Sequence, residues 1–489
     1  MHSLQTKRAW RTFRQVAPLA LVVGYFLWLI WPATREYFNP DDTMNLCVAW
    51  YNTSVSSLIK STFGFWMGAI RPFGSLYYRL VYEVAGFHPF LFRATCFLLL
   101  ILNLVLAYRF FQLLTNSRRE TFLASFVGCF HGAMWNIYAS TGTVYDILCQ
   151  TFVLTAVNLY IAHRSRENIS WPRAAAIWLA HVLALGSKEM AYTLPLVFLS
   201  YELVFRLPAS WAEALAWLAR QFRVAGVTGI ISTAAWIGRK AGQHAPDDVY
   251  GYQILLTGES LLRALQQYLH LLFFKTVTFT GAQALALIGA ALICAILFRS
   301  RLMTFGWLYA MVLAIPLLIV PPRHSGYVLY VPFTGCVLYF IGAVRVACSW
   351  LERLAGRVSQ SELLKAAPMP IIYSVILAAA AVSHVAERRL VWVFDFAPGG
   401  GELVRTLSED MLRLYPSLPP NTRILFINDA FKSDTLQPQF ILHLTYGDKS
   451  LKVAKMTHDA KSGALTIPPG SYDHVFEYDG TRYREVRGR

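Results

Sequence analysis

Two adjacent carboxylates, Asp41 and Asp42, are the sharpest candidates for chemistry in this sequence. They lie in the segment Asn39-Pro40-Asp41-Asp42, just after the first long apolar block. A carboxylate held in place near a lipid surface can act as a general base. The segment also has the composition of a helix start, because Asn39 is a good N-cap, Pro40 suits the first turn and acids favour the positive end of the helix dipole. Both interpretations stay open and are compatible, since a cap also fixes a catalytic side chain.

Three more charged residues stand at the edges of apolar segments. Asp146 begins one such segment, where a single acid is typical of a helix start. Lys188 and Glu189 lie between two short apolar segments, near or within membrane depth. Charges at that depth are costly and usually face a cavity or one another. The alternative is a turn from which both charged ends snorkel to the membrane surface.

Arg323 is the only arginine in the loop before a late apolar segment that begins at Tyr327. Tyr327 alone is typical of the aromatic belt at a membrane interface. Asp247 and Asp248 form a second acidic pair, which is typical of a solvated face or a helix cap. We keep this second pair as a secondary candidate.

Membrane-spanning helices must position these residues. The chain has 489 residues, of which 56% are hydrophobic and only 15% charged, whereas soluble domains carry about 25% charge. Crossing a bilayer as a helix takes roughly twenty apolar residues, and in lipid the backbone has to satisfy its own hydrogen bonds. The predicted fold is an all-α multi-span membrane protein with about eleven spans. These are Val16–Ala33, Pro89–Leu114, Thr121–Tyr138, Val144–Ala162, Ala174–Ser187, Met190–Phe205, Val224–Ile237, Ala282–Phe298, Leu302–Val320, Tyr327–Val344 and Met369–Val385.

The net charge of +16 would suit a nucleic-acid binder, but the positions of the basic residues argue against that class. They recur after every other span, which is the positive-inside pattern and places these loops and the N-terminus in the cytoplasm. The clusters are Lys7, Arg8, Arg11 and Arg14; Arg118 and Arg119; Arg164, Arg166 and Arg173; Arg299 and Arg301; and Arg345, Arg353 and Arg357. The first apolar block is predicted to be an uncleaved span, and the spacing of the seven cysteines indicates neither a disulfide nor a metal framework.

Two large regions are predicted outside. Residues 34–88 form the first outer loop, with two stretches of helical apolar spacing that indicate amphipathic helices at the membrane surface. Because the span count is odd, residues 386–489 also lie outside, as a small α/β domain of unknown role that follows the membrane domain 1–385. Its predicted elements are a strand at Arg423–Ile427, a helix at Gln437–Leu444, a strand at Leu451–Met456 and a hairpin turn at Asp479-Gly480.

One outer face thus gathers the acid pair, Asp146, Lys188 and Arg323. A base with two cations suits transfer of a group from a phosphate carrier, because the base accepts a proton from the incoming hydroxyl and the cations stabilise the departing phosphate. No P-loop or dinucleotide fingerprint is present, and no nucleotide sugar is expected outside. A lipid carrier is therefore the expected donor.

This pattern resembles the GT-C superfamily of membrane glycosyltransferases over roughly residues 18–344. It looks closest to the branch of protein O-mannosyltransferases, TMTC-type O-mannosyltransferases and their bacterial relatives. The matching residues are Asp41-Asp42 in the first outer loop, Ser187-Lys188-Glu189 with Leu194-Pro195, and Arg323 with Tyr327, Tyr330 and Pro332. The resemblance implies an inverting transferase that uses a polyprenyl-phosphate sugar. Asp41 would be the leading base beside Asp42, Lys188 and Arg323 would bind the donor phosphate, and Asp146, Glu189 and Tyr327 would support them.

The sequence departs from that family in ways that leave the acceptor open. The acidic motif is Asp-Asp instead of Asp-Glu, and neither a TPR array nor a MIR-like domain is present. The expected partners are the lipid-linked donor, a hydroxyl on a protein or glycan, and membrane lipids, without nucleic acid. No cofactor is predicted, and a divalent metal is left open. The expected location is a bacterial inner membrane with an extracytoplasmic site. The alternatives are a transporter or flippase of lipid-linked saccharides, although repeated halves are not detected, and a non-catalytic scaffold.

Overall fold

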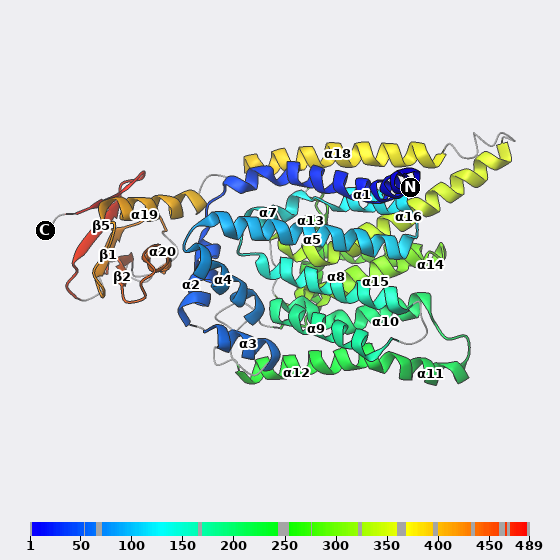
Figure 1. The fold of residues 1–489 in the computed structure, drawn as a ribbon, viewed down its shortest axis with the longest axis horizontal. Helices are drawn as coiled ribbons and strands as arrows, with labels where there is room; N and C mark the ends of the chain where they lie inside the picture. The colour runs from blue at the N-terminus through cyan, green and yellow to red at the C-terminus, as the bar shows by residue number, and fades with distance from the viewer. Residues whose placement is uncertain are drawn as a thin grey trace.

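The computed structural model is a helical bundle with a small α/β domain at one end (Figure 1). It describes residues 2–52, 54–64, 71–164, 169–242, 254–274, 276–320, 325–358, 368–394, 400–431, 436–458, 465–466 and 470–486. The bundle helices are α1 (His2–Ile30), α5 (Pro89–Thr115), α6 (Arg118–Gly128), α7 (Trp135–Ala139), α8 (Val144–Arg164), α9 (Trp171–Ser187), α10 (Leu194–Phe205), α11 (Trp211–Gln221), α12 (Val227–Gly242), α13 (Gly258–Leu272), α14 (Gly281–Leu297), α15 (Arg301–Leu318), α16 (Tyr330–Val358) and α18 (Pro368–Phe394).

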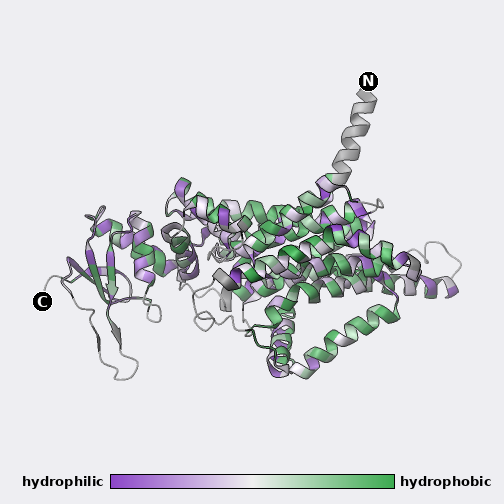
Figure 2. Cartoon of the chain, turned by 90° about the horizontal axis from the view of Figure 1, so that it is seen from below, coloured by the Kyte–Doolittle hydropathy of each residue, from purple (hydrophilic) through white to green (hydrophobic). Residues whose placement is uncertain are grey.

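The described residues contain six helices that are long and apolar enough to cross a membrane. They include α5, α8, α15, α16 and α18, together with residues 16–35. A multi-pass membrane fold is thereby confirmed, whereas the count of eleven spans stays a prediction. Figure 2 shows hydrophobic residues dominating the bundle helices and hydrophilic residues collecting in the terminal domain and at helix ends.

Close packing holds the bundle helices together. An added Cβ at Gly306 of α15 would lie 2.5 Å from the backbone nitrogen of Tyr339 in α16, so only glycine permits this approach. Helices α9 and α10 form a hairpin beside α8. Lys188 between them contacts Asp146 at the start of α8. Glu202 near the end of α10 pairs with Arg164 at the opposite end of α8.

The first outer loop contains three helices instead of the two predicted. They are α2 (Pro40–Asn52), α3 (Val55–Gly64) and α4 (Pro72–Ala85). The first apolar stretch divides between α2 and α3, because the chain is not helical at Ser54. Helices α2 and α4 lie between the bundle and the C-terminal domain, whereas α3 packs against α4 and α9 (Figure 1).

The C-terminal domain has the predicted elements and one helix that was not predicted. That helix is α19 (Gly400–Leu414), and the last bundle helix extends to Phe394. Helix α20 (Gln437–Tyr446) precedes β2, and the four-stranded sheet has the order β2-β1-β5-β6. Strand β1 (Arg423–Asn428) pairs in parallel with β2 (Lys452–Lys455) and β5 (His474–Tyr478), and β5 forms the predicted hairpin with β6 (Tyr483–Glu485). A two-stranded ribbon joins β3 (Thr457–His458) to β4 (Leu465–Thr466).

Candidate active site

Asn39 and Asp42 together cap the start of helix α2. Oδ2 of Asp42 accepts a hydrogen bond from the backbone N–H of Asn39 at 3.0 Å, and the N–H of Asp42 donates to the side-chain oxygen of Asn39 at 2.9 Å. This reciprocal pair is the geometry of a capping box. The helix-start interpretation of the acidic motif is therefore correct for Asp42.

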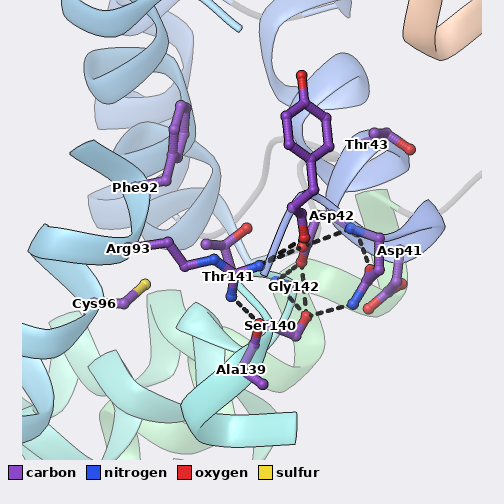
Figure 3. A network of polar contacts seen from close by, with 12 residues as sticks. Asp41, Asp42, Thr43, Phe92, Arg93, Cys96, Ala139, Ser140, Thr141 and Gly142 are labelled. Atoms are coloured by element: carbon purple, nitrogen blue, oxygen red, sulfur yellow. Dashed lines mark hydrogen bonds and ion pairs between the residues drawn. The ribbon is translucent and has the colours of Figure 1, made fainter. Parts of the chain in front are cut away.

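The Asp42 carboxylate is also fully buried in a ring of donors (Figure 3). Its Oδ1 accepts hydrogen bonds from the Ser140 hydroxyl, at 2.7 Å, and from the Gly142 N–H. The Arg93 guanidinium lies 3.7 Å from Oδ2 and donates to the carbonyl oxygens of Tyr37 and Ala139. These bonds stabilise the carboxylate and join the first outer loop to the loop before α8. A group so fully engaged is suited to anchoring rather than to exchanging protons with a substrate.

Asp41, one residue earlier, has the opposite surroundings. Its side chain is exposed, and its Oδ1 lies 3.3 Å from the amide nitrogen of Asn45. Desolvation by the surrounding protein, and then the neighbouring Asp42 charge, raise the pKa of Asp41, while Arg71 and Lys188 act in the other direction. A carboxylate that combines solvent access with a raised pKa is suited to proton transfer.

Gly142 lets the loop before α8 approach both carboxylates. An added Cβ at this position would lie 2.5 Å from Oδ2 of Asp41 and 3.1 Å from Oδ1 of Asp42. Any larger residue would therefore have to displace a carboxylate. The bare backbone also allows the Gly142 N–H to reach Asp42.

Three of the sequence-predicted residues meet at one point. The Lys188 ammonium is 2.5 Å from Oδ1 of Asp146, and both side chains are buried. The same ammonium lies over the Tyr327 ring, 4.2 Å from its centroid. Asp146 comes from the first turn of α8, Lys188 from the junction after α9, and Tyr327 from the short helix η6 (Gly326–Leu329). Lys188 thus faces another charge, whereas its depth in the membrane stays a prediction.

Glu189 holds two arginines that the sequence analysis did not single out. The Arg71 guanidinium donates to both of its carboxylate oxygens, at 3.0 and 3.1 Å, and Arg239 lies 4.0 Å away. Burial alone would raise the pKa of Glu189, but Arg71 and Arg239 outweigh burial and lower it to about 2. Arg71 also lies over the Tyr145 ring, 5.4 Å from its centroid. Glu189 therefore stays ionised and fixes Arg71 near Asp41.

The signal that singled out Arg323 could have found Arg71 as well. Both are arginines in loops predicted to lie outside, against the overall charge bias. Arg93 and Gly142 carry no comparable sequence signal, because their roles depend on contacts between distant segments. Arg323, Asp247 and Asp248 lie outside the described residues.

Other parts of the described chain do not add to this cluster. Within the described ranges, no group of three or more His, Cys, Asp or Glu side chains is arranged to hold a metal ion. A cavity of about 200 Å³ lies beside Tyr160, Arg164 and Arg223, at the end of α8 opposite to Asp146. It is separate from the acidic motif.

Comparison with known proteins places the fold. No family model matches the sequence, and no curated protein sequence is significantly similar to it. Among solved structures, ArnT from Cupriavidus metallidurans bound to undecaprenyl phosphate aligns over 90% of this chain and 86% of its own, with a TM-score of 0.50 and 14% identity. The apo state of that protein gives 0.49 at 13% identity. The archaeal oligosaccharyltransferase AglB from Archaeoglobus fulgidus, in complex with an inhibitory peptide and a dolichol-phosphate, gives 0.49 at 12% identity, over 90% of this chain and 64% of its own.

The chain therefore has the overall fold of the ArnT structure. Its placement in the O-mannosyltransferase branch stays a prediction.

Proposed function

We propose that this protein is an inverting glycosyltransferase that moves a sugar from a polyprenyl-phosphate carrier to a hydroxyl group. The observation that carries the proposal is the difference in surroundings between the two carboxylates of the acidic motif. Asp42 is buried and fully bonded, whereas Asp41 is exposed, has a raised pKa and lies near cations. The GT-C fold supports the same reaction class. The neighbouring ArnT structure holds undecaprenyl phosphate, which makes that lipid the first carrier to test.

In the proposed reaction Asp41 is the general base. It takes the proton of the acceptor hydroxyl as that oxygen attacks the anomeric carbon from the face opposite to the phosphate. The bond between the anomeric carbon and the phosphate oxygen breaks, and polyprenyl phosphate departs with the electron pair. The configuration at the anomeric carbon is inverted. Asp42 takes no part in proton transfer, and it positions Asp41 through the helix cap.

Cations would stabilise the charge that grows on the departing phosphate. Among the residues that the structure describes, Lys188 and Arg71 are the candidates for this role, because the charges of both lower the pKa of Asp41. Arg323 is retained from the sequence analysis as a further phosphate ligand. Asp146, Glu189 and Tyr327 would hold these cations in place, as their contacts with Lys188 and Arg71 indicate.

The finer parts of the proposal follow from the sequence alone. Mannose is the first sugar to test, because the motifs resemble O-mannosyltransferases, and the acceptor would be a protein or glycan hydroxyl. The positive-inside pattern favours a site on the extracytoplasmic face, in a bacterial inner membrane.

Purified protein with defined donors tests the proposed function. Polyprenyl-phosphate sugars should support transfer to a hydroxyl acceptor, and nucleotide sugars should not. Turnover with a nucleotide sugar alone would contradict the proposal. Movement of a lipid-linked saccharide across a vesicle membrane without any transfer would favour the flippase alternative.

A further inference from the structure

The C-terminal domain contacts the helix that carries the acidic motif. The side-chain amide nitrogen of Gln437, at the start of α20, donates to the Pro40 carbonyl oxygen at 2.9 Å. Its amide oxygen lies 2.8 Å from the Thr43 hydroxyl, which donates to it. Pro40 and Thr43 directly flank Asp41 and Asp42, and both Thr43 and Gln437 are buried. One side chain of the distant domain therefore bonds on both sides of the motif.

The same domain also holds the other end of α2. The Lys449 ammonium donates to the carbonyl oxygens of Trp50 and Tyr51, at 3.0 and 3.2 Å, and lies over both rings. The last carbonyls of a helix have no partner within the helix, and a cation there also complements the helix dipole. The His443 ring stacks on the Tyr51 ring with 5.7 Å between centroids.

The position of helix α2 depends on the contacts that neighbouring elements make with it. Helix α2 has only 13 residues, and isolated helices of that length are marginal in water. One face of its first turn bonds to the loop before α8 through Asp42, and another bonds to Gln437. The first turn, including Asp41, thus lies between the bundle and the C-terminal domain.

We infer that the C-terminal domain positions the proposed base, with Gln437 as a positioning residue for Asp41 and Lys449 as its counterpart at the far end of α2. This inference rests on the proposed function. It gives the domain a role within the active site and makes catalysis depend on docking of residues that follow the last bundle helix. A different role, as an acceptor-binding module, would leave Asp41 correctly placed when the Gln437 contacts are removed.

The test compares Gln437→Met with the intact protein. Methionine keeps the length of the side chain but removes both hydrogen-bonding groups. We expect kcat to fall about tenfold or more, because small misplacement of a catalytic group is costly. The KM for the lipid-linked donor should be unchanged, because Arg71 and Lys188 lie on other elements. Asn428→Leu is the control. This substitution removes a hydrogen bond from Asn428 to the Tyr478 carbonyl oxygen, which lies inside the same domain and away from α2.

The pH profile separates misplacement from simple loss of folded protein. Asp41 faces the charges of Asp42, Arg71 and Lys188. If the first turn of α2 moves outward, desolvation of Asp41 falls, and the acidic limb of kcat/KM shifts to lower pH. Partial unfolding would lower activity equally at every pH.

Hydrogen exchange keeps the inference testable without turnover. Backbone amides of α2 should exchange faster in Gln437→Met and in Lys449→Met than in Asn428→Leu. A double variant combines Gln437→Met with Lys449→Met. The inference would be overturned if this variant had normal kcat and unchanged hydrogen exchange in α2. If the intact protein transfers no sugar, the proposed function fails, and α2 exchange alone then decides whether the domain holds the helix.

Discussion

At the scale of single residues, two adjacent carboxylates have different surroundings. Asp42 points into a set of donors formed by Asn39, Ser140 and Gly142, and Asp41 has access to solvent. The sequence could locate this pair and name both of its possible roles, because N-caps and acids at helix starts follow local rules. It could not assign the roles, since that depends on a loop about a hundred residues away.

The pKa of Asp41 gives a first prediction. The base must be ionised, and desolvation together with Asp42 raises its pKa. The acidic limb of kcat/KM should therefore lie at higher pH than for an ordinary aspartate. The protonated form is favoured in the folded state, so the stability that Asp41 contributes is present at low pH and is lost as pH rises through the raised pKa. Arg71→Gln removes a cation that lowers this pKa, and should move the limb to still higher pH. An acidic limb at the ordinary aspartate position, unmoved by Arg71→Gln, would contradict this reading.

Gly142→Ala tests the close approach of the loop to the motif. The new Cβ would overlap Oδ2 of Asp41, at 2.5 Å, and make a tight contact with Oδ1 of Asp42, at 3.1 Å. Because hydrogen bonds hold Asp42 in place, Asp41 has to move. We expect turnover to fall about tenfold or more and stability to fall by about 1–3 kcal/mol. Gly24→Ala is the matched control, because an added Cβ there meets nothing within 4 Å. Activity and thermal unfolding in detergent measure both effects, and equal results for the two variants would refute the assigned contact.

At the scale of elements, the site is assembled from helix starts and junctions. Asp146 stands in the first turn of α8, and Lys188 stands where the α9–α10 hairpin turns. Hydropathy could place these junctions, because spans and interruptions have strong composition signals. It could not give the partner of each charge, since pairing depends on which helices are neighbours. The division of the first outer loop into α2 and α3 was likewise missed, because the apolar spacing continues across the break.

The pair of Lys188 and Asp146 gives a prediction at this scale. Lys188→Met leaves a buried carboxylate without its cation, which should lower stability by about 3–5 kcal/mol. Adding Asp146→Asn removes the unpaired charge and should restore much of that loss. If Lys188 also stabilises the departing phosphate, turnover of the double variant should stay about 100- to 1,000-fold below that of the intact protein. A double variant with normal stability and normal turnover would leave Lys188 with a structural role only.

At the scale of the whole molecule, the bundle and the C-terminal domain share one hydrophobic core. Buried residues from α1, α2, α5, α8, α19, α20 and the sheet belong to the same cluster. The acidic motif lies at the end of the bundle next to this domain, away from the N-terminus (Figure 1). Composition predicted the membrane class, and the local motifs predicted most elements of the C-terminal domain. Its docking on α2 was not predictable, because it depends on Gln437 and Lys449, which are ordinary polar residues in the sequence.

The sidedness of the molecule can be tested by labelling. The positive-inside pattern places the C-terminal domain outside and the loop at Arg299 inside. In a background in which the seven native cysteines are replaced, an impermeant thiol reagent should label Ser471→Cys in intact cells. It should label Arg299→Cys only after the membrane is opened. The reverse pattern would place the acidic motif in the cytoplasm.

Turnover of Asp41→Asn, measured beside Asp42→Asn with a polyprenyl-phosphate sugar, tests the central claim most directly. Asparagine keeps the size of Asp41 and removes its basicity, so the protein should fold normally while turnover falls by about a hundredfold or more. Asp42→Asn weakens a buried acceptor that faces Arg93, so it should lower thermal stability, while the folded fraction keeps measurable turnover. Near-normal turnover in Asp41→Asn, with normal folding, would contradict the assignment of Asp41 as the base.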